Sequence, residues 1–301
     1  MADKELNLKE LISIFVKNKF FIVIFSTIFA LFSVFFALSI PNSYTSSAVV
    51  KVNSDKDQSN ISSSLSQYAN IASIAGISLP SSGSDKSEFV IKSIQSRDFF
   101  KYIFKFDKIG INLFAASNYD KDLNEIKYNP KLYDSDKKKW TRKAKDGSIS
   151  IPTYLEVYEE VYSEKLSIVK DKDSGFIFIS FSHVSPFFSE YFLSLIIDEI
   201  NTITRKKDLE DSRNSLEYLK NQLTLTKETS IKKSINVLIM EQLGTQMIAN
   251  INDDYIVEYI DKPFVPEKKS APLRAFICIM ISTLGGILSL LIVFIKERFF
   301  G

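Results

Sequence analysis

Two long apolar runs, Phe20–Ile40 and Ala275–Ile295, lie near opposite ends of the chain and contain no charged residue. At about 1.5 Å of rise per residue, each makes a helix of roughly 30 Å, which matches the hydrocarbon core of a bilayer. The pattern therefore predicts two transmembrane helices. The expected parts of the chain are an N-terminal segment (1–19), a first membrane helix (20–40), a loop domain (41–274), a second membrane helix (275–295) and a tail (296–301).

Each run has an alternative interpretation. The first could be a cleaved secretory signal, because the Ala-Leu-Ser at 37–39 resembles a cleavage site. Apolar regions of signals usually span about 7–15 residues, fewer than here, and the acidic leader residues Asp3, Glu5 and Glu10 also favour an uncleaved anchor. The second could be a buried helix of a soluble protein, but its length and lack of charge favour a membrane span.

Flanking charge predicts how the chain crosses the membrane. Only Lys51 follows the first run closely, whereas several lysines precede it, namely Lys4, Lys9, Lys17 and Lys19. Positive residues favour the cytoplasmic side, so both termini are expected in the cytoplasm and the loop domain outside, which is the periplasm in a Gram-negative cell. The charges around the second run do not decide its orientation.

Apolar spacing predicts a mixed α and β loop domain. Four stretches have the pattern of strands: Tyr44–Val52, Leu166–Val169, Phe176–His183 and Tyr255–Asp261. The last of these is expected to lie beside the first. Helical spacing predicts helices at 61–77, 86–104 and 154–166.

A long helical stretch completes the domain. Pro186–Arg205 is strongly apolar at helical spacing, and a polar stretch with a narrow apolar stripe continues from 206 to about 250. Its roughly 45 residues would make a rod near 65 Å, which would pair with another helix as in a coiled coil. Packing within a compact domain is the alternative. A weak patch in the stripe lies at Thr224–Ser230.

Composition excludes several classes of function. With 38 basic and 36 acidic residues the net charge is only +2, so bulk nucleic-acid binding is not indicated. One histidine (His183) and one cysteine (Cys278) cannot make a Cys/His zinc site, a Cys–His nucleophilic pair or an intrachain disulfide. The glycines match no nucleotide-binding motif. No catalytic residue, cofactor or metal is expected, and the chain is interpreted as a non-enzyme.

Three groups of residues are candidate sites. Small residues in the second apolar run have the spacing that favours close helix contact: Ser282, Gly285, Gly286 and Ser289. The segment 262–273 is predicted to be a stiff polyproline II spacer through Pro263, Pro266 and Pro272. Trp140 and Arg142 lie in the basic insert 137–145, which could contact an acidic glycan, although such a run is more often a solvated loop.

Several stretches, in this order, carry a resemblance to a known family. They are YTSSAVVKV after the first apolar run, LSQYANIASIAGISLP with SEFVIKSIQSRDFF, the strand FIFISF, and DKPFVPEKKSAPLRAF before the second run. The chain resembles the polysaccharide co-polymerases, the Wzz-type chain-length determinants of O-antigen and related surface polysaccharides, in their two-helix form without a kinase domain. It departs from the family pattern at Lys269 and in the basic insert.

The resemblance implies an α+β periplasmic domain with a membrane-proximal α/β base and a long extended helix, flanked by two transmembrane helices in the bacterial inner membrane. It implies a homo-oligomer that works with a separate membrane polymerase on a lipid-linked glycan, among membrane lipids and without nucleic acid. Together they set how many repeat units of lipopolysaccharide or a related glycan are joined. The small-residue face of the second run is then a candidate contact for the polymerase. Two alternatives stay open. One is a component that couples polysaccharide export to an outer-membrane channel, and the other is a periplasmic sensor.

Overall fold

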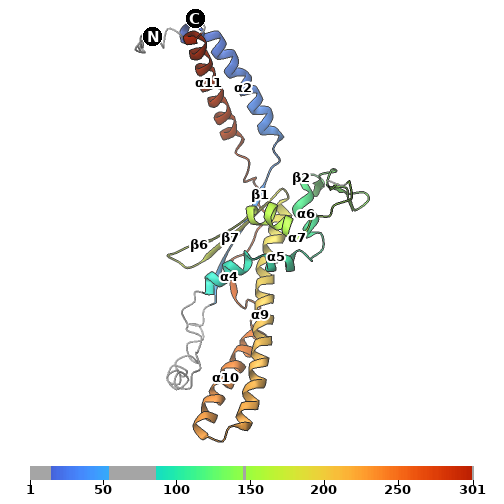
Figure 1. Ribbon diagram of the computed structural model, residues 1–301, viewed down its shortest axis with the longest axis vertical. Coiled ribbons are helices and arrows are strands. Elements are labelled where there is room, and N and C mark those ends of the chain that lie inside the picture. The colour runs from blue at the N-terminus through green and yellow to red at the C-terminus, as the bar shows by residue number, and fades with distance from the viewer. Residues whose placement is uncertain (1–14, 54–85, 145–146, 300–301) are drawn as a thin grey trace. The chain divides into compact units, whose positions relative to one another are not determined.

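The computed structural model describes residues 15–53, 86–144 and 147–299. The chain forms two compact units (Figure 1). A helical unit comprises residues 1–43 and 268–301, and a mixed domain comprises residues 44–267. The helix expected at 61–77 lies outside the described residues.

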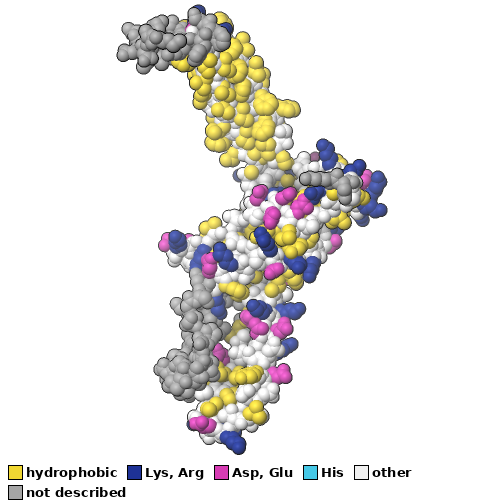
Figure 2. All heavy atoms as spheres, in the orientation of Figure 1, with side chains coloured by type: hydrophobic (Ala, Val, Ile, Leu, Met, Phe, Trp, Pro, Cys, Tyr) yellow, Lys and Arg dark blue, Asp and Glu magenta, His cyan; other side chains and the backbone are white. Residues whose placement is uncertain are grey.

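The helical unit consists of two antiparallel helices packed side by side, α2 (Lys19–Ser39) and α11 (Arg274–Phe299) (Figure 1). Both are long and apolar enough to cross a membrane, with a mean hydropathy of 2.6 in each. Their outer surface is almost entirely hydrophobic (Figure 2), and large side chains such as Phe20, Leu31 and Phe35 are exposed. Apolar side chains on the outside suit contact with lipid, so the two helices fit a two-pass membrane protein with a large soluble domain.

A four-stranded antiparallel sheet organises the mixed domain. Its strand order is β6-β7-β1-β8. The strands are β1 (Tyr44–Val52), β6 (Leu166–Lys170), β7 (Ile177–His183) and β8 (Val257–Asp261). All four lie where the sequence predicts strands, and β8 pairs with β1 as expected.

One face of this sheet is covered by the first part of α9 (Pro186–Leu225). Alternate residues of β1, including Ala48 and Val50, are buried against a core that contains Phe181, Phe192 and Ile196. The alternation along β1 is the consequence of a sheet with one face in the core. The structure confirms the fold class expected from the sequence. This is a mixed α and β domain with a long helix, which lies between two apolar helices in the chain.

Short helices close the core. They are α4 (Lys86–Ile94), α5 (Arg97–Ile103), α6 (Ile109–Ala115) and a continuous helical stretch made of α7 (Tyr154–Val157), η2 (Tyr158–Tyr162) and α8 (Ser163–Lys165). Two small hairpins follow α6, formed by β2 (Ala116–Asp120) with β3 (Glu125–Tyr128) and by β4 (Tyr133–Asp134) with β5 (Lys139–Trp140).

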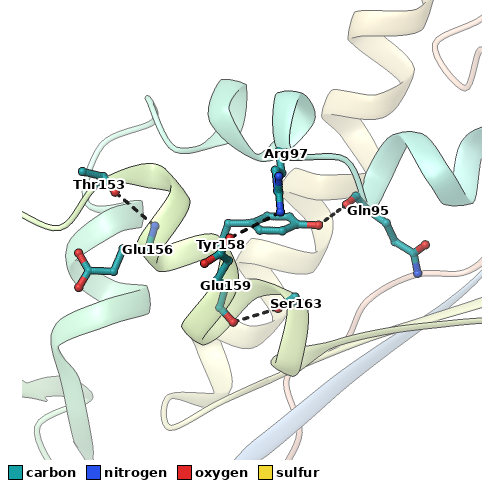
Figure 3. A network of polar contacts seen from close by, with 7 residues as sticks. All are labelled: Gln95, Arg97, Thr153, Glu156, Tyr158, Glu159 and Ser163. Atoms are coloured by element: carbon teal, nitrogen blue, oxygen red, sulfur yellow. Dashed lines mark hydrogen bonds and ion pairs between the residues drawn. The ribbon is translucent and has the colours of Figure 1, made fainter.

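Polar contacts fix the helical stretch 154–165 against α4 and α5 (Figure 3). The Tyr158 hydroxyl donates to the carbonyl oxygen of Gln95 at 2.6 Å, and Arg97 pairs with Glu159 at 3.6 Å. The buried Tyr162 hydroxyl donates to the carbonyl oxygen of Ile94 at 2.8 Å. The two tyrosine hydroxyls thus bind the carbonyl oxygens of Ile94, the last residue of α4, and of the next residue, Gln95, where carbonyl groups lack helical partners.

The prediction of a single amphipathic helix at 86–104 is wrong in one respect, because the helix is interrupted between α4 and α5. Ser96 has an extended backbone, and its hydroxyl accepts a hydrogen bond from the Phe99 N–H at 3.1 Å. A serine in this geometry caps the start of a new helix. The apolar spacing continues through the break, which is why it suggests one helix.

The prediction of one continuous helix from 206 to about 250 is also wrong. Helix α9 ends at Leu225, and α10 (Thr229–Ile251) folds back against it as a hairpin (Figure 1). The hydroxyl groups of Thr224 and Thr226 donate to the carbonyl oxygens of Asn221 and Gln222. Threonine is a poor helix former partly because its side chain competes for backbone groups in this way. The long helix is α9 itself, about 60 Å in length for its 40 residues.

Candidate functional site

The small-residue face of α11 packs against α2. At Gly285, a Cβ atom would lie 2.5 Å from the Cβ of Phe29, far closer than such atoms approach. Ser289 and Ser33 are fully buried, and each hydroxyl donates to a carbonyl oxygen of its own helix at 2.7 Å. Small residues thus let the two helices of one chain approach closely. Ser282 is half-buried on the same helix.

Gly286 has a different environment from Gly285. Nothing lies within 4 Å of a Cβ built at Gly286. It lines an open groove of about 380 Å³ within the helical unit, together with Ile22, Val23, Ser26, Thr27, Ala30 and Leu290. Half of these side chains are small, namely those of Ser26, Thr27 and Ala30. The groove is therefore a place where a further helix could approach the pair closely.

Arg274 ties the ends of α2 and α11 together. Its guanidinium donates to the carbonyl oxygens of Ala37 and Ile40, at 3.1 and 3.4 Å, and to the Asn42 Oδ1 at 3.1 Å. A cation at a helix C-terminus satisfies carbonyl groups that lack helical partners. The sequence around Arg274 does not indicate this contact, because its three acceptors lie more than 230 residues earlier in the chain.

The opposite end of the helix pair carries an ion pair between Lys17 and Glu297 at 2.7 Å. The two helices are therefore held together by polar contacts at both ends and by close packing at Gly285 between those ends.

The proline segment is attached to its neighbours in both units. Within the mixed domain, Pro266 is buried and the Ser46 hydroxyl donates to the carbonyl oxygen of Phe264 at 2.8 Å. Within the helical unit, Ser43 forms an isolated bridge with Ala271. Pro263 and Pro272 are half-buried. The interpretation as a stiff spacer stays a prediction.

Trp140 and Arg142 take part in packing. The indole lies edge-on to Tyr133 and Phe114, with ring centroids 5.4 and 6.3 Å away. Arg142 lies over the Phe114 ring at 5.2 Å and pairs with Glu156, and this hydrogen bond raises the pKa of Arg142. Their positions are accounted for within the domain. The glycan contact stays a prediction, and no geometry supports it.

His183 is a structural residue. The buried imidazole accepts a hydrogen bond at Nδ1 from the Ser185 N–H at 3.1 Å, which makes Nε2 the donor to the carbonyl oxygen of Asn112 at 2.9 Å. Burial lowers its pKa from 6.5 to about 3, so the ring is neutral. In the part of the chain that the structure describes, no three His, Cys, Asp or Glu residues gather as metal ligands.

Two apolar helices that flank a mixed α and β domain in the chain fit the class of two-pass membrane proteins with one large soluble domain. Within that class, residues 4–105 match the model of the Wzz family, described as chain length determinant protein. The match agrees with the resemblance that the sequence motifs indicate, over the first third of this chain.

Solved structures include similar chains. A full-length bacterial polysaccharide co-polymerase shares 14% sequence identity over 97% of this chain and 98% of its own, with a TM-score of 0.41. A fragment of WzzB, a polysaccharide co-polymerase from Salmonella Typhimurium, shares 13% identity over 76% of this chain and 100% of its own, with a TM-score of 0.32. No curated protein matches. The similarity to the Wzz family therefore rests on the match of residues 4–105.

Proposed function

We propose that this protein is a non-enzymatic, inner-membrane regulator of polysaccharide chain length. The observation that carries the proposal is the match of residues 4–105 to the chain length determinant family. Two apolar helices of membrane-spanning length are consistent with it. In this proposal both termini face the cytoplasm and the mixed domain lies in the periplasm, as the lysines before the first helix favour.

The proposed mode of action is scaffolding. Several copies of the chain assemble and hold a separate membrane polymerase near the growing lipid-linked glycan. The glycan is O-antigen or a related surface polysaccharide, and the scaffold influences how many repeat units are added before release. No residue of this chain is assigned a chemical step.

The groove beside Gly286 is the proposed contact for a polymerase helix. Gly285 and Ser289 are occupied by packing within the chain, whereas Gly286 borders open space. The small side chains of Ser26 and Ala30 on α2 complete a surface on which a third helix could pack closely. The structure thus divides the face predicted from sequence into an internal part and an outward part.

Deletion of the gene tests the function. We expect the surface polysaccharide, separated by size on a gel, to change from a modal cluster of lengths to a short, random ladder, and the cluster to return when the gene is restored. Loss of all surface polymer with intact precursors inside the cell would indicate export instead. An unchanged size distribution would contradict the proposal.

Two glycine variants test the membrane contact. Gly286→Leu should fill the groove, lower co-purification of the polymerase and shift the modal glycan length, while the helix pair stays intact. Thr283→Leu, which adds a similar side chain on an exposed part of α11, is the matched control. Gly285→Ala should instead weaken the helix pair itself, because overpacking typically costs about 1–3 kcal/mol. If Gly286→Leu behaves like Thr283→Leu in both measurements, the polymerase does not bind at this groove.

A further inference from the structure

The mixed domain contains a large open groove of about 1270 Å³. Helices α4 and α5 form one side, and the α9–α10 hairpin forms the other. Apolar side chains contribute much of its lining, among them Phe89, Tyr102, Ile203, Ile248 and Ile251. Phe89 is 51% exposed and Ile251 is 70% exposed. Side chains of this size at a protein surface, gathered in one concave place, mark a binding surface.

An exposed apolar stripe on α10 continues from this groove. Met240, Leu243, Met247 and Ile251 are spaced three or four residues apart, so they share one face of the helix, and all are exposed. The opposite face of α10 packs on α9 through Ile235 and Ala249. Helix α10 therefore has two apolar faces, and among the described residues α9 covers only one of them.

The course of the chain identifies an occupant. Asn53 and Lys86 both line the groove, and residues 54–85 connect them. Asn53 and Lys86 hold both ends of this connection at the groove, so the local concentration of residues 54–85 there is on the order of millimolar before any attraction acts.

The connecting residues have the composition that the groove requires. Residues 58–84 contain no charged side chain, and apolar residues recur at Leu65, Tyr68, Ile71, Ile74 and Ile77. The lining carries more carboxylates than lysines, with Asp98, Asp208, Asp253, Asp254 and Glu258 against Lys86 and Lys207. An acidic rim repels a polyanion and accepts an uncharged segment.

We propose that the groove, with the adjoining stripe on α10, is the docking surface for residues 61–79 of the same chain. The apolar side chains from Leu65 to Ile77 bind along Phe89, Ile248 and the exposed stripe. This contact would join the stretch LSQYANIASIAGISLP, which lies within the family match, to the α9–α10 hairpin. The proposal concerns folding within one chain and is independent of the proposed function.

Disulfide cross-linking of the full-length protein in membranes tests the docking. Cys278 is the only cysteine, so Cys278→Ser gives a clean background. One cysteine replaces Ser93, which lines the groove on α4, and a second replaces Ser64, Ser66, Ser73 or Ser78 in turn. The matched control places the first cysteine at Lys92, which lies next to Ser93 but does not line the groove and pairs with Glu88 on the exposed side of α4. Mass spectrometry of tryptic peptides identifies the linked residues, and non-reducing gels separate monomers from dimers.

We expect at least one of the Ser93→Cys pairs to give about tenfold more cross-linked monomer than its Lys92→Cys counterpart, because docking brings the segment to Ser93. Without docking the two yields should be similar, since both acceptors share the same tether and so the same local concentration of the segment. Adding Ile248→Asp should reduce the yield to the control level. Thr245→Cys on α10 provides a second acceptor in case the Ser93 variant does not fold. Equal yields from Ser93 and Lys92 would overturn the proposal. Cross-linked dimers would also overturn it, since the segment would then come from a second copy.

Discussion

Replacing Asn201 by leucine is expected to lower the free energy of unfolding of the mixed domain by about 3–5 kcal/mol, because three buried backbone groups lose their partner at about 1–3 kcal/mol each. Asn201 is 4% exposed on α9. Its Oδ1 accepts hydrogen bonds from the N–H groups of Ile256 and Val257, both at 2.9 Å. Its Nδ2 donates to the carbonyl oxygen of Val257, also at 2.9 Å. This one side chain therefore anchors the start of β8 to α9.

The measurement is chemical denaturation of the full-length protein in detergent, followed by the fluorescence of Trp140. This is the only tryptophan, and it lies against Tyr133 and Phe114 inside the mixed domain. Thr202→Val is the matched control, because its hydroxyl is bonded only within its own helix, to the carbonyl oxygen of Asp198. If Asn201→Leu lowers the free energy of unfolding no more than Thr202→Val does, the hydrogen bonds of Asn201 contribute little to the stability of the domain.

The strands could be predicted because their signal is local and regular. Alternation along Tyr44–Val52 indicates a sheet with one buried face, and the structure buries every second residue of β1. The neighbouring position of β8 follows from its short apolar pattern and from its place in the chain, since β1 comes soon after the first apolar run and β8 comes shortly before the second. These predictions rest on an alternation of apolar and polar positions that many residues share, so a single unusual side chain does not obscure it.

The breaks between helices were harder to predict because each depends on one or two side chains. Apolar spacing runs through Ser96 without interruption, and only the cap geometry shows that α5 begins there. At Thr226 the stripe weakens, but a weak stripe does not tell whether a helix bends, frays or reverses. The reversal is decided by contacts that are distant in sequence, such as the hydrogen bond from the Ser212 hydroxyl to the carbonyl oxygen of Gln242.

The candidate site was predictable only in part, for a geometric reason. Gly285 and Gly286 are adjacent in sequence and equally small, yet they lie about 100° apart around the helix. Their roles differ because Phe29 lies against Gly285 and nothing lies against Gly286. Likewise, the sequence shows Arg142 in a basic run but does not show that Glu156 and Phe114 surround it. Spacing identifies a face of a helix, whereas packing partners decide what each residue does.

Acidification from pH 7 to pH 5 is expected to lower the free energy of unfolding of the mixed domain by about 2 kcal/mol through His183 alone. The pKa of this residue falls from 6.5 when exposed to about 3 when folded, chiefly because burial disfavours the charged ring, with Lys165 adding to the effect. Between these two values the unfolded chain binds a proton that the folded chain does not. The stabilisation is therefore complete above pH 6.5 and is lost as the pH falls toward 3, at about 1.4 kcal/mol per pH unit.

Denaturation at pH 7, 6 and 5 with the wild type and His183→Gln measures this contribution. The variant should be less stable at pH 7, because the hydrogen bonds to Asn112 and Ser185 are disturbed, but its stability should change little from pH 7 to pH 5. Carboxylates such as Asp120 and Asp171 cannot produce the same profile. Their ordinary pKa is 3.8 and the fold lowers it, through hydrogen bonds from Lys127 and from backbone N–H groups, so they titrate at lower pH. Parallel pH profiles for the two proteins would show that the protons are bound elsewhere and that His183 is not the group that makes this domain sensitive to acid.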